Sequence, residues 1–79
     1  MKKITEFELG LLKDCLEMFE NTHSYYSDIY SDVKLAINIE MWSDPKYLLR
    51  ECKFYLSDTH CYDTELYTQL ENYLNNERD

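Results

Sequence analysis

Cysteine and histidine are the residue types in this chain best suited to metal or nucleophilic chemistry. The residues nearest to a zinc ligand set, with thiol, imidazole and carboxylate groups, are Cys52, Asp58, His60 and Cys61. Their spacing is unsuitable, because structural zinc sites usually contain close cysteine pairs such as C-x2-C, whereas Cys52 and Cys61 are nine residues apart. We therefore expect no bound metal and no cofactor.

A nucleophilic cysteine–histidine pair has no better support. His60 and Cys61 are adjacent, and side chains of neighbouring residues rarely face each other, while an acidic setting disfavours the thiolate. The chain has no phosphate-binding loop and no nucleophile elbow, and the single glycine, Gly10, cannot form a phosphate cradle. The sequence thus predicts no catalytic residues and no enzymatic activity.

The three cysteines, Cys15, Cys52 and Cys61, form no close pair. This pattern favours reduced thiols that pack as small apolar side chains over a disulfide framework. Residues 1–6 lead into a charged amphipathic segment that differs from a signal peptide, and the apolar runs are too short to span a membrane. We expect no membrane partner and a cytoplasmic location, in the host cell if the gene is phage-encoded.

Charge is the strongest signal in the composition: 16 Asp and Glu oppose 8 Lys and Arg, for a net charge of −8. Such a surface repels nucleic acid and anionic lipid and attracts basic proteins. The acid falls into two blocks, because residues 14–33 and 54–79 each sum to −5, whereas 1–13 and 34–53 each sum to +1. We expect a basic partner protein, of the nucleic-acid-binding kind, and no direct contact with nucleic acid.

The first block holds five carboxylates without Lys or Arg: Asp14, Glu17, Glu20, Asp28 and Asp32. On one continuous helix they would share, with Glu6, an arc of about 120°. Carboxylates three or four residues apart stand about 5–6 Å from each other, close to the spacing of phosphates along a nucleic-acid strand. Such a row can imitate a DNA or RNA backbone. The competing interpretation is a solvated outer face that keeps the protein soluble.

Eight tyrosines are the second unusual feature. Tyrosine offers a large, rigid contact area with a polar tip, so an exposed tyrosine beside acid is suited to protein binding. Tyr25, Tyr47 and Tyr67 fall outside the apolar faces described below. The residues predicted to bind the partner are Asp14, Glu17, Glu20, Tyr25, Asp28, Asp32, Asp63, Glu65, Tyr67 and Glu71.

One Gly and one Pro leave few turn residues for β-hairpins, so helices are favoured. Thr5 and Glu8 fit a capping box that starts a helix at Glu6. Residues 21–24 are poor helix formers, so a break there and one unbroken helix both remain open. A spacing of three and four lays these side chains on one face: Leu9, Leu12, Leu16, Phe19, His23, Tyr26, Tyr30, Val33 and Ile37.

Residues 33–41 fit two patterns, because their apolar positions also alternate with a period of two, as in a half-buried strand. A lone strand leaves its backbone groups unpaired. We therefore predict helix, with an α+β fold as the alternative if residues 33–41 form a strand.

The Ser43-Asp44-Pro45 sequence is typical of a helix start, and residues 57–60 indicate a connection before a last helix capped by Asp63 or Thr64. The inward side chains expected on these two helices are Leu48, Leu49, Cys52, Tyr55, Leu56, Leu66, Leu70, Tyr73 and Leu74. The predicted fold is all-α: a small three- or four-helix bundle with a C-terminal αα-hairpin, in which residues 1–79 form one acidic helical domain.

In size, acidity and tyrosine-rich helices the chain is similar to small phage-encoded inhibitors of host defence, such as anti-restriction and anti-CRISPR DNA mimics, and to bacteriocin immunity proteins. The resemblance is one of composition. It implies an inhibitor of a protein target, such as a defence nuclease, and assigns no residues. The alternative function is a structural or assembly module that forms a homodimer through its apolar helical face and residues 33–41.

Overall fold

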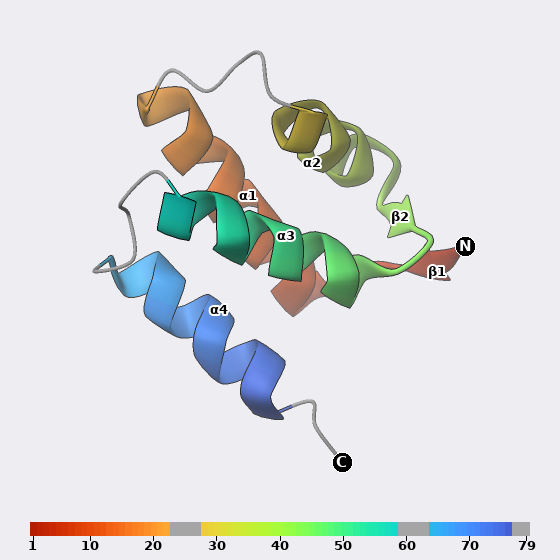
Figure 1. Cartoon of the computed structure of the whole chain (residues 1–79). Helices are drawn as coiled ribbons and strands as arrows, with labels where there is room; N and C mark the ends of the chain where they lie inside the picture. Colours follow the sequence, from red (N-terminus) through yellow and green to blue (C-terminus); the bar gives the residue numbers. More distant parts are fainter. Residues whose placement is uncertain (23–27, 59–63, 77–79) are drawn as a thin grey trace.

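The computed structural model describes residues 1–22, 28–58 and 64–76, which form four helices and one two-stranded sheet (Figure 1). The elements follow in the order β1 (Lys2–Lys3), α1 (Glu6–Asn21), α2 (Asp28–Ile39), β2 (Met41–Trp42), α3 (Pro45–Asp58) and α4 (Glu65–Asn76). Each strand has two residues, so helix dominates the regular structure. The all-α prediction is confirmed.

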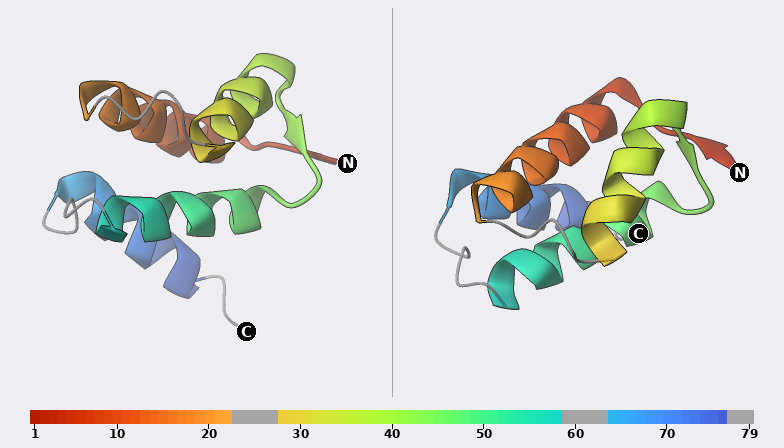
Figure 2. Two further views of the ribbon diagram at one scale, coloured as in Figure 1. Left: turned by 45° about the horizontal axis from the view of Figure 1, so that its top comes forward. Right: turned by 90° about the horizontal axis from the view of Figure 1, so that it is seen from above.

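The helices pack in two layers. Figure 2 shows α1 and α2 in one layer and α3 and α4 in the other, and the shortest extent, 16 Å, accommodates two helices packed about 8–10 Å apart. Helix α4 turns back along α3 and packs against it (Figure 1). The predicted C-terminal αα-hairpin is confirmed.

Three helices, α1, α3 and α4, begin at caps that the sequence indicates. The Thr5 hydroxyl accepts from the Glu8 N–H at 3.2 Å, and a Glu8 carboxylate oxygen accepts from the Thr5 N–H at 2.9 Å, which completes the capping box of α1. Asp44 accepts from a first-turn N–H of α3 at 3.3 Å, and Thr64 does the same for α4 at 3.2 Å. These bonds satisfy amides that have no partner inside the helix.

The long apolar face is divided between two helices. Helix α1 ends at Asn21, and the Thr22 hydroxyl donates to the carbonyl oxygens of Met18 and Phe19 at 3.1 and 3.2 Å. Of the two alternatives left open for residues 21–24, the structure has the break. His23 and Tyr26 lie outside the described residues.

Residues 33–41 are helical as far as Ile39, which confirms the helix prediction for most of the segment. Glu40 then takes a left-handed backbone conformation, with φ of 60°, and its N–H donates to the Ala36 carbonyl at 2.8 Å. This turn leads into β2, which pairs antiparallel with β1 in the register Lys2 with Trp42 and Lys3 with Met41. The partner strand at the N-terminus has no alternating pattern, so the sequence did not reveal it.

The core lies between the two layers, and the inward faces predicted for α3 and α4 are buried or partly buried there. In α1 the buried face includes Leu11, which the predicted face omitted, whereas Leu9 and Leu16 are partly buried. The connection predicted to begin at residue 57 is wrong for Ser57 and Asp58, which are helical. The fully buried Leu56 holds the last turn of α3 in place. The largest fully buried side chains are Phe19, Ile4, Leu12, Leu48, Leu49, Leu56 and Leu70.

Candidate partner-binding surfaces

A groove of about 480 Å³, which we call the acidic groove, runs between α2 and α3. Asp28 and Asp32 line it from α2, and Glu51 and Asp58 line it from α3. The α2 pair is one turn apart, which places the side chains about 6 Å from each other, and the α3 pair is two turns apart, about 10 Å along the axis. Among the described residues that line this groove, none is Lys or Arg.

An exposed aromatic residue lines the same groove. Phe54 is 64% exposed, whereas Ile29 and Tyr55 at the same groove are partly buried against the core. Burying a phenylalanine side chain typically contributes about 1.5–3 kcal/mol. Because Phe54 is mostly exposed, the fold gains little of this free energy from it, and the ring is available to a partner.

The cation next to Phe54 in sequence is directed to α4. Lys53 Nζ lies 4.0 Å from a Glu71 carboxylate oxygen and 5.6 Å from the centre of the Tyr67 ring. Glu71 and Tyr67, both predicted to bind a partner, therefore contact a cation of their own chain. Lys53 is therefore paired with α4 and is not among the residues that line the acidic groove.

The carboxylates of the acidic groove differ in their relation to the helix dipoles. Asp28 lies in the first turn of α2, where negative charge is favourable. Asp58 is the last residue of α3, where negative charge opposes the dipole. The dipole of α3 therefore does not favour a carboxylate at Asp58.

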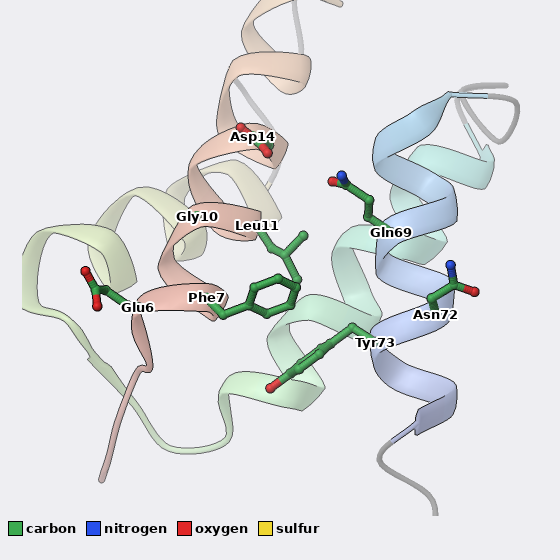
Figure 3. A pocket seen from close by; sticks show the side chains of 8 residues that line it. All are labelled: Glu6, Phe7, Gly10, Leu11, Asp14, Gln69, Asn72 and Tyr73. Carbon is green, nitrogen blue, oxygen red and sulfur yellow. The ribbon is translucent and has the colours of Figure 1, made fainter.

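A second groove, which we call the mixed groove, follows α1 and α4. Its wide part has a volume of about 530 Å³. Figure 3 shows Phe7 and Leu11 reaching toward α4, Tyr73 reaching toward α1, and Gln69 facing Asp14. The rings of Phe7 and Tyr73 are 5.2 Å apart, so the floor of this part is largely apolar.

The narrow part of the mixed groove has a volume of about 240 Å³ and is acidic. Asp14 and Glu17 from α1 meet Glu65 from α4 there, and Asp14 and Gln69 line both parts. This groove brings together carboxylates from both acidic blocks of the sequence.

A buried carboxylate ties α4 to the start of α1 below the mixed groove. Glu8 is 4% exposed, and one of its oxygens accepts from the Tyr73 hydroxyl at 2.9 Å while the other caps α1 through the Thr5 N–H. Both carboxylate oxygens are therefore hydrogen-bonded, as burial of a charged group requires.

The single acidic row expected along one helix is divided. Asp14 and Glu17 lie on α1 in the mixed groove, whereas Asp28 and Asp32 lie on α2 in the acidic groove, and the two helices are separate elements. Glu20 accepts a hydrogen bond from the Tyr30 hydroxyl at 3.0 Å. Two further predicted binding residues, Tyr25 and Asp63, lie outside the described residues.

Two carboxylates of the acidic groove were missed by sequence reasoning. Glu51 lies in the segment 34–53, whose summed charge of +1 gave no sign of an acidic surface. Asp58 was assigned to a connection between helices. Their spacing of seven residues places them on one side of a helix. That spacing could have identified them.

The described cysteines are buried structural residues. Cys15 and Cys52 are fully buried, and a thiol–thiol hydrogen bond with Cys15, together with burial, raises the pKa of Cys52 well above its ordinary value. A thiol of this kind is a poor nucleophile at neutral pH. No group of three or more metal-binding side chains occurs in residues 1–22, 28–58 and 64–76, and His60 and Cys61 are outside these ranges.

Comparison with known proteins gives no relative: no protein-family model, curated protein or solved structure matches the chain. In the part of the chain that the structure describes, no helix combines the length and apolar character needed to cross a bilayer. The two grooves are the features of this surface best suited to binding a partner.

Proposed function

We propose that this protein is a small acidic inhibitor that binds a basic, nucleic-acid-binding protein and occupies its nucleic-acid groove. The observation that carries the proposal is the acidic groove, which Asp28, Asp32, Glu51 and Asp58 line together with the exposed Phe54, with no lining cation among the described residues. The class of target that we propose is a host defence nuclease, and the proposed origin of the gene is a phage or mobile element.

The physical basis is imitation of a nucleic-acid strand. Proteins that bind nucleic acid neutralise phosphates with Lys and Arg, and those that bind single strands also stack bases on aromatic side chains. Carboxylates about 6–10 Å apart can take the places of phosphates, and the Phe54 ring can take the place of a base. Association would be accelerated by the negative field of the whole protein.

Affinity capture and displacement test this proposal. The tagged protein is incubated with lysate of the source or host organism at 50 and 300 mM NaCl. Each protein that it captures is then purified and loaded with labelled DNA or RNA. The inhibitor should displace the nucleic acid at low salt, with affinity at least about tenfold weaker at high salt, because ion pairs between exposed groups are screened.

The displacement step decides the outcome. Release of nucleic acid by the wild-type protein and none by Phe54→Ala combined with Asp28→Lys and Glu51→Lys supports mimicry. A captured protein that keeps its nucleic acid while the inhibitor is bound would exclude it.

Self-association is the second candidate function, and a specific observation favours it. Leu35 and Ile39 are one turn apart on α2 and are 50% and 45% exposed, and Met41 on β2 is 39% exposed. Sedimentation equilibrium at two salt concentrations tests this candidate. A salt-insensitive dimer that Leu35→Lys converts to a monomer supports an assembly module, whereas a monomer at all concentrations excludes it.

A further inference from the structure

The single glycine of the chain, Gly10, occupies a position where the fold does not need glycine. It lies inside α1, its φ is not positive, and a Cβ atom placed there would meet nothing within 4 Å. Glycine inside a helix lowers stability relative to alanine. The described fold therefore gives no reason for the missing side chain, and a close approach by another molecule does give one.

Gly10 lies beside the apolar floor of the mixed groove. Phe7 is 58% exposed, and its ring lies 5.2 Å from the Tyr73 ring at an interplanar angle of 49°. Leu11 lies one residue beyond the glycine and lines the same groove (Figure 3). Without a side chain at Gly10, a second helix could pack nearer to the α1 backbone than the usual separation of about 8–10 Å.

The narrow part of the mixed groove is negatively charged and therefore complements a basic partner. Asp14, Glu17 and Glu65 line it, and no Lys or Arg is among the described residues that line either part. From Phe7 to Asn21 the groove follows about 21 Å of α1, the length of a helix of about four turns. A second copy of this chain would bring the same carboxylates together, so like charges argue against self-pairing here.

We propose that the mixed groove binds an amphipathic helix of a protein partner. That helix places a small residue opposite Gly10, apolar side chains on Phe7, Leu11 and Tyr73, and Lys or Arg against Asp14 and Glu17. The acidic groove shares no lining residue with the mixed groove, so this second surface can work whether or not the first imitates nucleic acid.

The probe for the test is a synthetic 18-residue helix of Leu, Ala and Lys with Leu on one face. Titration into the ¹⁵N-labelled full chain should shift the amide signals of Gly10, Asp14 and Gln69 more than those of Asp32 and Phe54. A control peptide of the same composition, with Leu distributed around the helix, should bind at least about fivefold more weakly. Equal binding of the two peptides, or shifts centred on the acidic groove, would overturn the proposal.

Gly10→Ala separates a binding role from a structural one. The variant should raise the midpoint of thermal unfolding by about 2–8 °C, because alanine is the better helix former, and should weaken binding of the peptide at least about fivefold. Ser31→Ala, on the exposed face of α2, is the matched control: it should stabilise the protein and leave binding of the peptide unchanged. A stabilised Gly10→Ala variant with wild-type affinity would contradict the proposal.

Discussion

The acidic groove and the mixed groove contain similar numbers of carboxylates but arrange them differently. In the acidic groove, four carboxylates and one exposed aromatic residue, Phe54, line the same groove. In the mixed groove, Asp14, Glu17 and Glu65 lie at one end of an apolar floor that contains Phe7 and Tyr73, and Glu6 also lines the wide part. The difference teaches that helix pairing, rather than the order of charges along the chain, decides which carboxylates share a surface and which apolar side chains lie beside them.

The largest stability difference between the grooves should come from their aromatic residues. Tyr73→Phe removes the donor to the buried Glu8 carboxylate and should lower the free energy of unfolding by about 1–3 kcal/mol. Phe54→Ala, at the exposed ring of the acidic groove, should change it by less than about 0.5 kcal/mol. Urea denaturation followed by circular dichroism measures both. Equal losses of unfolding free energy in the two variants would show that Phe54 supports the fold as much as Tyr73 does.

A smaller effect should distinguish two carboxylates at opposite helix ends. Asp58 opposes the dipole at the end of α3, whereas Glu65 in the first turn of α4 favours it. Asp58→Asn should stabilise the protein by about 0.3–1 kcal/mol, and Glu65→Gln should destabilise it by a similar amount. Thermal unfolding at low and high salt provides the check, because added salt should shrink both effects. Changes of the same sign would show that the dipole argument is wrong.

The buried thiol of Cys52, in the core beneath both grooves, should make the free energy of unfolding depend on pH in alkali but not near neutral pH. The raised pKa of Cys52 means that the native protein keeps this thiol proton while the unfolded chain loses it above about pH 8.5. Stability is therefore fully present below that pH and falls above it, by up to about 1.4 kcal/mol per pH unit. Cys52→Ala should flatten this alkaline decline in urea unfolding measured from pH 7 to 10. An unchanged slope would mean that other groups cause it.

Local chemistry explains what the sequence could predict. The capping box of Thr5 and Glu8, the Asp44 cap and the inward leucines of α3 and α4 depend on residues within a few positions of each other, and the structure has all of them. These features gave the helical bundle and the αα-hairpin.

The features that the sequence could not predict depend on contacts between segments far apart in the chain. The pairing of β1 with β2, the Tyr73–Glu8 hydrogen bond and the Lys53–Glu71 ion pair each join residues far apart in the chain. A sum of charges over consecutive residues cannot show that Lys53 compensates Glu71. It also cannot show that Glu51 and Asp58 complete a groove begun on α2.

The most direct measurement compares matched charge reversals in the displacement assay. One variant carries Asp28→Lys, Asp32→Lys and Glu51→Lys in the acidic groove, and the other carries Asp14→Lys, Glu17→Lys and Glu65→Lys in the mixed groove. Both change the net charge equally. The proposal predicts that the first loses at least about 100-fold in its ability to displace nucleic acid, because close ion pairs are lost and repulsion replaces them, while the second loses less than about fivefold. Equal losses would show that net charge, rather than the acidic groove, directs binding, and would contradict the central claim.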